Sequence, residues 1–99
     1  MEIIKNVIDD VCEIKLVGRL DTTTAPELET ALKEVLEAST KNLQIDLEQL
    51  DYISSAGLRV LVKAHKAMKD RGGVRISHCN SLVTEVFKLT GFLNVFRFE

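Results

Sequence analysis

The chain passes from a strand-like run to a helical pattern within one stretch, Asp51-Tyr52-Ile53-Ser54-Ser55-Ala56-Gly57-Leu58-Arg59-Val60-Leu61. Serine is a preferred N-cap residue, because its hydroxyl oxygen accepts a hydrogen bond from an otherwise unpartnered amide of the first turn. Ala56 and Gly57 add little bulk there, so a partner backbone or a phosphate could approach the free amides, where the helix dipole favours negative charge. We therefore expect an accessible helix start at Ser54 and Ser55, whose hydroxyls serve as a cap, as a modification site, or as both.

After this stretch, the pattern predicts the rest of a helix, a short strand, a further helix and a last strand. Each helix carries an apolar stripe and ends at glycine, which favours the left-handed backbone of a helix C-terminus. The boundaries are Gly72-Gly73 for the end of the first helix, residues 74–76 for the strand, Asn80 or Ser81 to Gly91 for the next helix and residues 95–98 for the last strand. The side chains expected to face the core are Leu58, Leu61, Val62, His65 and Met68, then Leu82, Val86 and Leu89.

Before this stretch, the pattern predicts a hairpin. Residues 3–7 and 11–17 alternate between apolar and polar side chains around a turn at Asp9-Asp10. Such alternation is typical of antiparallel strands with one face in water.

A helix and a strand follow the hairpin. The helix begins at Thr24, with Pro26 in its first turn, and Glu27 completes a capping box with Thr24. It runs to about Ala38, and a loop from residue 39 to 42 leads to a strand over residues 43–47.

The predicted fold is a single α/β domain over residues 1–99, in the order β-β-α-β-α-β-α-β. Alternating strands and helices favour parallel strand pairs, so we expect a mixed sheet with helices packed against it. Sites in such sheets form at the carboxyl ends of strands. Asp21 and Thr22 follow one strand and Ser54 follows another. If these strands are neighbours, the two loops share one rim and Asp21 faces the serines.

Composition excludes several classes of function. The 99 residues are 45% hydrophobic and 28% charged with a formal net charge of −2, which leaves no basic face for nucleic acid. There is no apolar run of the ~20 residues that span a membrane and no secretory signal pattern, so we expect a cytoplasmic protein with no membrane partner. Cys12, Cys79, His65 and His78 share no metal-ligand spacing, so we expect free thiols, no metal and no cofactor.

Catalysis is not expected. His65 lies about three turns along the same helix as Ser55, roughly 15 Å away at 1.5 Å per residue, so it cannot act as its base. His78 follows a strand and could approach, but the serines lack the Gly-x-Ser-x-Gly elbow, and no P-loop pattern is present. The sequence therefore predicts a small interaction domain with a modifiable hydroxyl at an exposed helix start.

The chain resembles the STAS domain family, specifically the single-domain bacterial anti-sigma factor antagonists. The motifs that carry the resemblance span essentially the whole chain: Gly18-Arg19-Leu20-Asp21, Ile45-Asp46-Leu47, Tyr52-Ile53-Ser54-Ser55-Ala56-Gly57-Leu58, Gly72-Gly73 and Leu89-Thr90-Gly91-Phe92.

The resemblance implies a partner switch without catalytic activity of its own. In this family the unphosphorylated antagonist binds an anti-sigma factor that is also a serine kinase, which frees the sigma factor. Phosphorylation of the serine before x-Gly-Leu, here Ser55, releases the antagonist, and a PP2C-type phosphatase resets it. Asp21 corresponds to the family aspartate near the site. The implied partner-binding residues are Asp21, Thr22, Ser54, Ser55, Ala56, Gly57, Leu58 and Arg59.

Three residues depart from the family pattern. Ser54 stands where the family commonly has aspartate, Ala56 replaces serine or threonine, and Arg59 replaces a glycine. Ser54 is thus a competing phosphate acceptor or a cap, and Arg59 adds a cation that could hold a phosphate one turn into the helix. Constitutive binding without phosphorylation is one alternative. Another is a STAS module that acts as a scaffold or as a sensor of a small ligand or nucleotide, independently of Ser55.

Overall fold

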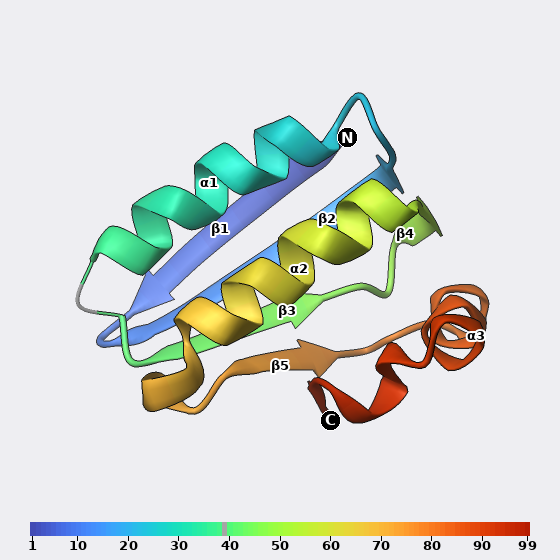
Figure 1. Ribbon diagram of the computed structural model, residues 1–99. Helices are drawn as coiled ribbons and strands as arrows, with labels where there is room; N and C mark the ends of the chain where they lie inside the picture. Colours follow the sequence, from blue (N-terminus) through green and yellow to red (C-terminus); the bar gives the residue numbers. More distant parts are fainter. Residues whose placement is uncertain (39) are drawn as a thin grey trace.

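The computed structural model describes residues 1–38 and 40–99 (Figure 1). The predicted loop at 39–42 therefore begins on a residue that lies outside the described ones. The strands are β1 (Glu2–Ile8), β2 (Val11–Leu20), β3 (Asn42–Asp46), β4 (Leu50–Ile53), β5 (Val74–Ser77) and β6 (Arg97–Phe98). The helices are α1 (Ala25–Glu37), α2 (Ser55–Ala67) and α3 (Ser81–Thr90), with 3₁₀ turns η1 (Lys69–Arg71) and η2 (Phe92–Asn94).

The sheet is mixed, as predicted. Its strands follow the order β1-β2-β3-β5-β6, where β1 and β2 are antiparallel and the other pairs are parallel. The predicted order of strands and helices is confirmed, with β4 as an addition that the sequence pattern did not separate. The long strand β2 pairs with β3 over its first half and with β4 at its end, after a register shift between Gly18 and Arg19.

Helices α1 and α2 lie side by side over one face of the sheet, and α3 lies beyond its end, against β4 (Figure 1). The core between the helices and the sheet is apolar. Removing its side chains from water is the main favourable term in folding. The largest fully buried side chains are Phe87, Ile14, Leu16, Leu20, Leu28, Leu32, Leu43, Ile45, Leu47, Leu50, Leu58 and Leu61. In the part of the chain that the structure describes, no helix is long and apolar enough to cross a membrane.

The buried face of α3 differs from the predicted one. Leu82 and Leu89 were expected to face the core, but they are 59% and 79% exposed, so that expectation is wrong. Val83 and Phe87 are fully buried instead, and Val86 packs partly against the core. The helix is thus rotated by about one residue from the face that the leucine spacing suggested.

Asn80 explains the rotation of α3. Its side-chain oxygen accepts a hydrogen bond from the Val83 amide at 2.9 Å, which makes Asn80 the N-cap. Its side-chain nitrogen donates to the carbonyls of Leu47, Glu48 and Leu50. Because one side chain holds both the helix start and the β3–β4 turn, it fixes which face of α3 meets the sheet.

Arg71 joins the end of α1 to the turn after α2. Its guanidinium donates to the carbonyls of Leu36 at 3.1 Å, Ala38 at 3.3 Å and Thr40 at 2.9 Å. A cation at this end of a helix also complements the helix dipole. The helix α2 itself ends at Ala67, and η1 intervenes before the left-handed Gly72, so the helix is shorter than the glycine pair predicted.

The two cysteines are free. Cys12 is fully buried and Cys79 partly so, and burial raises the pKa of both thiols. A raised thiol pKa keeps the unreactive protonated form at neutral pH. This confirms the expectation of free thiols.

Candidate functional site

Two loops meet where β2 and β4 end. These strands are parallel and pair Leu20 with Ile53, and the Ser54 amide donates to the Leu20 carbonyl at 2.8 Å. The residues that follow, Asp21 on one loop and Ser55 on the other, are therefore held at one rim of the sheet. This is the neighbour relation on which the predicted juxtaposition depended.

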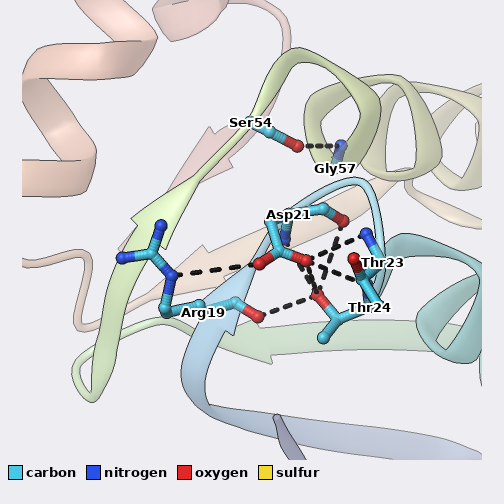
Figure 2. Close-up of polar contacts among 6 residues, drawn as sticks. All are labelled: Arg19, Asp21, Thr23, Thr24, Ser54 and Gly57. Carbon is cyan, nitrogen blue, oxygen red and sulfur yellow. Dashed lines mark hydrogen bonds and ion pairs between the residues drawn. The ribbon is translucent and has the colours of Figure 1, made fainter.

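The two serines at the start of α2 have different roles. Ser54 is the N-cap, and its hydroxyl oxygen accepts a hydrogen bond from the Gly57 amide at 3.2 Å (Figure 2). Its carbonyl accepts from the Leu58 amide. Ser55 is the first helical residue and is exposed, and its hydroxyl makes no hydrogen bond to any described residue. Of the two hydroxyls, that of Ser55 is open to an incoming reagent.

The Asp21 carboxylate organises the loop before α1 (Figure 2). Its Oδ1 accepts from the amides of Thr23 and Thr24, both at 3.0 Å. The Thr24 amide above all, with the Thr23 amide, the Thr24 hydroxyl and the Arg19 charge, holds the pKa of Asp21 below its ordinary value. The carboxylate is therefore a fixed negative charge beside the start of α2.

The capping box predicted at Thr24 does not form. Thr24 is the N-cap residue of α1 by position, but its side chain caps no amide of the helix. The Thr24 hydroxyl accepts from the Asp21 amide and donates to the Arg19 carbonyl, both at 2.8 Å. Because these bonds already engage the hydroxyl, it serves the loop at the site rather than the helix.

Sequence reasoning missed Arg19 and Tyr52 as neighbours of the site. The Arg19 guanidinium lies over the Tyr52 ring, 4.5 Å from its centroid, and its Nε is 3.8 Å from the Asp21 carboxylate. Both side chains are exposed. Their position in the sequence could have indicated them, because each lies one or two residues before a loop at the end of β2 or β4.

Two predicted contact residues face inward. Leu58 is only 2% exposed, and Gly57, in the first turn of α2, is buried against β2. A Cβ on Gly57 would lie 2.5 Å from Cγ of Leu20, so the space left by its missing side chain is occupied by the core rather than open to a partner. These two residues shape the helix start, and the surface consists of Asp21, Thr22, Ser54, Ser55, Ala56 and Arg59.

A groove between α1 and α2 begins at this surface. Thr22, Ala56 and Arg59 line its first part, a depression of about 300 Å³. It continues into a larger part of about 430 Å³ with Leu32, Leu36 and other apolar side chains along it. The Glu29 carboxylate and the Lys63 ammonium, 2.8 Å apart, form an ion pair between the two helices at the junction of the parts.

The histidines have partners away from Ser55. His65 Nδ1 accepts a hydrogen bond from the Val74 amide at 3.0 Å, and its ring packs edge-on against Phe96. His78 Nδ1 lies 3.3 Å from the Asp46 carboxylate. Neither histidine is paired with the Ser55 hydroxyl, so the arrangement of a nucleophile and its base is not formed at this rim.

One group of side chains among the described residues has the composition of a metal site. Ligand atoms of Asp46, Glu48 and His78 lie within 4.8 Å of one another at the ends of β3 and β5. The buried Asp46 carboxylate already accepts from the Glu48 amide and pairs with His78. These contacts explain the cluster as a polar link between the ends of β3 and β5.

Comparison with known proteins identifies relatives over nearly the full length. Residues 2–99 match the family model described as the STAS domain. The chain is 33% identical over 97 residues to Bordetella bronchiseptica BtrV, whose name describes a candidate anti-sigma factor antagonist; the match covers 97% of this chain and 84% of BtrV. It is 31% identical over 84 residues to the anti-sigma-B factor antagonist of Staphylococcus aureus, covering 84% of this chain and 78% of that protein.

Solved structures have the same fold. An anti-sigma factor antagonist from Mycobacterium paratuberculosis is similar with a TM-score of 0.89 and 26% identity, over 98% of this chain and 83% of that one. The anti-sigma factor antagonist SpoIIAA in its unphosphorylated form is similar with a TM-score of 0.84 over 99% of this chain and 88% of that one. The identity to SpoIIAA is 14%, so that likeness concerns the fold alone.

Proposed function

The chain belongs to the STAS domain family, and we propose from this that it is an anti-sigma factor antagonist controlled by phosphorylation of Ser55. In this proposal the unphosphorylated protein binds an anti-sigma factor and thereby frees a sigma factor. The binding surface consists of Asp21, Thr22, Ser54, Ser55, Ala56 and Arg59. Phosphorylation releases the anti-sigma factor again. The chain acts by binding and carries out no reaction of its own.

The observation that carries the proposal is the difference between the environments of the two serine hydroxyls. Ser54 is engaged as the helix cap, whereas the Ser55 hydroxyl is exposed and has no partner among the described residues. A kinase needs such a hydroxyl as the acceptor of the γ-phosphoryl group of ATP, with ADP as the leaving group and the hydroxyl proton released. Ser55 also occupies the position that the family resemblance assigns to the phosphoserine.

The physical consequence of phosphorylation falls on the interface rather than on the fold. A phosphate adds roughly −1.5 to −2 charges at neutral pH. At the start of α2 the helix dipole favours that charge by about 0.3–1 kcal/mol, so the domain tolerates it. A partner packed over Ala56 would meet a bulky hydrated anion next to the Asp21 carboxylate. A loss of only ~2.8 kcal/mol in binding weakens affinity about a hundredfold.

The proposed partners are an anti-sigma factor that is itself a serine kinase and a PP2C-type phosphatase that removes the phosphate. Both would act on the same exposed rim, because the phosphorylated atom is the Ser55 hydroxyl oxygen. The cytoplasmic location stays a prediction from the sequence, consistent with a switch that consumes ATP.

The second candidate function is a scaffold or a sensor of a small ligand, independent of the charge on Ser55. The groove between α1 and α2 favours it, since about 430 Å³ with an apolar lining is within the size range of small-molecule sites. This reading predicts that a ligand raises the melting temperature of Ser55→Ala and Ser55→Asp proteins equally.

Phosphate mapping tests the main proposal. The protein is incubated with ATP and, one at a time, with histidine-kinase-like ATPases from the same organism, and peptides are analysed by mass spectrometry. We expect one phosphate on Ser55 in the wild type and in Ser54→Ala, and none in Ser55→Ala. Phosphate on Ser54 would contradict the assignment of the cap, and an unmodified protein with every such ATPase would favour the scaffold reading.

A further inference from the structure

Arg59 lies one turn after Ser55 on α2, and both side chains are exposed. We infer that Arg59 is the intramolecular counter-ion of a phosphate on Ser55. This inference rests on the proposed function, because it concerns the phosphate that the function places there. Arg59, and not the helix dipole alone, would then stabilise the negative charge of the phosphate.

The geometry of α2 brings the two side chains together. The helix is continuous from Ser55 to Ala67, so residues four apart are neighbours on its surface, with about 5–6 Å between their Cβ atoms. Side chains in a helix also lean toward its N-terminus, which directs Arg59 back toward Ser55. The acid at position i and the base at i+4 is the favourable order for such a pair.

Little stands between the two residues. Ala56 is partly buried, and Gly57 has no side chain and faces Leu20. Ala56 and Arg59 both line the depression that begins at the site. A guanidinium can therefore reach over Ala56 to a phosphate at the helix start and donate two parallel hydrogen bonds to its oxygens.

The charges around the site leave Arg59 available. Arg19 is held by the Tyr52 ring and the Asp21 carboxylate, and Lys63 is paired with Glu29. Arg59 takes part in none of the ion pairs of the described residues, and the first turn of α2 contains no acid. A phosphate on Ser55 would be the first anion within a helical turn of Arg59 on its own helix.

The pairing changes what the partner meets. Before phosphorylation, Arg59 presents an exposed cation that a carboxylate of the anti-sigma factor can bind. After phosphorylation, the same guanidinium is occupied by the phosphate, and the surface loses a cation while it gains an anion. One modification would thus remove an attraction and add a repulsion at the same rim.

The test is a phosphorus NMR titration of protein that carries phosphoserine at position 55, incorporated during translation so that no kinase is needed. The pH midpoint of the phosphate signal is compared between the Arg59 protein and the Arg59→Gln variant. Lys66→Gln is the matched control, because Lys66 is an exposed cation farther along the same helix. Arg19→Gln tests the other arginine near the site.

We expect Arg59→Gln to raise the proton-binding constant of the phosphate roughly twofold, the size of an exposed ion pair between residues four apart. Lys66→Gln and Arg19→Gln should leave it within the error of the titration. Equal midpoints in Arg59→Gln and the unsubstituted protein, or an increase in Arg19→Gln alone, would overturn the inference. Because this titration needs neither kinase nor partner, its failure is separate from a failure of the proposed function, which the phosphate mapping reports.

Discussion

Gly57 is the residue at which the fold and the candidate site meet. Any larger residue at this position would push on the Leu20 side chain and on the Leu20 carbonyl, which is 3.2 Å from the position of a Cβ. That carbonyl also accepts a hydrogen bond from the Ser54 amide, and this bond joins the two loops of the site. Glycine is required here for close packing of α2 onto β2, not for an unusual backbone angle.

We predict that Gly57→Ala destabilises the protein. Overpacking a core costs about 1–3 kcal/mol, which outweighs the gain of up to ~1 kcal/mol from placing alanine in a helix. Chemical denaturation of the single variant should show a net loss of up to about 2 kcal/mol. In a Leu20→Ala background the same substitution should cost clearly less, because the clashing side chain is gone and only the close contact with the Leu20 carbonyl remains. An equal loss in both backgrounds would contradict this account of Gly57.

Asp21 predicts a pH dependence of stability. Hydrogen bonds from the Thr24 and Thr23 amides lower the pKa of its carboxyl in the folded protein. Stabilisation by a carboxylate with a lowered pKa is complete above the ordinary aspartate pKa and disappears as the pH falls through the folded pKa. Denaturation curves should therefore show the wild type more stable than Asp21→Asn at neutral pH, with the gap closing in acid. A gap that stays constant down to the acid limit would show that the charge is not involved.

At the scale of elements, the ends of helices are held by long-range side chains. Arg71 holds the end of α1 from the turn after α2, and Asn80 joins the start of α3 to the β3–β4 turn. Such bonds connect residues about thirty positions apart. Local capping signals cannot reveal them, because the partner carbonyls are brought near only by the tertiary fold.

Arg71→Ala should destabilise the protein by about 1–3 kcal/mol, because carbonyls of Leu36 and Thr40 lose a charged donor. Lys69→Ala is the control, since Lys69 is exposed in the same turn and makes no side-chain bond among the described residues. We expect the control to change the free energy of unfolding by less than about 0.5 kcal/mol. Equal losses in the two variants would refute the bridging role.

The elements show which sequence signals are reliable. The alternation over residues 11–17 correctly predicted a strand with one buried face, because a strand has only two faces, and Cys12, Ile14 and Leu16 form the buried one. The stripe of α3 was misread, since its leucines at positions 82 and 89 share a helical spacing but point to solvent. Strand β4 was not separated from the strand before it, because four residues are too few to show a period, and its pairing with β2 depends on the tertiary fold.

At the scale of the whole molecule, the sequence predicted the rim of the site but not its detail. The predicted order placed Asp21 and Ser55 after two strands but left open whether these strands are neighbours. The structure brings the ends of β2 and β4 together through Leu20 and Ser54. The sequence predicted that Leu58 faces the core, but it could not predict which of Ser54 and Ser55 is the cap, nor that Gly57 packs against Leu20. Those outcomes depend on where the first turn of α2 begins relative to the sheet.

The fold also determines why a charge on Ser55 should act on binding alone. The hydroxyl lies outside the core and is bonded to no described residue, so its modification breaks no internal contact. The melting temperature and the far-ultraviolet spectrum of Ser55→Asp should therefore match those of the wild type. A fall in melting temperature of many degrees would show that this position supports the fold.

The most direct test of the central claim is calorimetry of binding between this protein and the anti-sigma kinase that phosphorylates it. We predict that Ser55→Ala binds about as tightly as the wild type, and that Ser55→Asp or the phosphorylated protein binds at least about a hundredfold more weakly. Ser54→Ala, with its cap removed, should lose stability but retain the response to phosphorylation. Equal affinity of the phosphorylated and unphosphorylated proteins, both correctly folded, would contradict the claim that Ser55 is the switch.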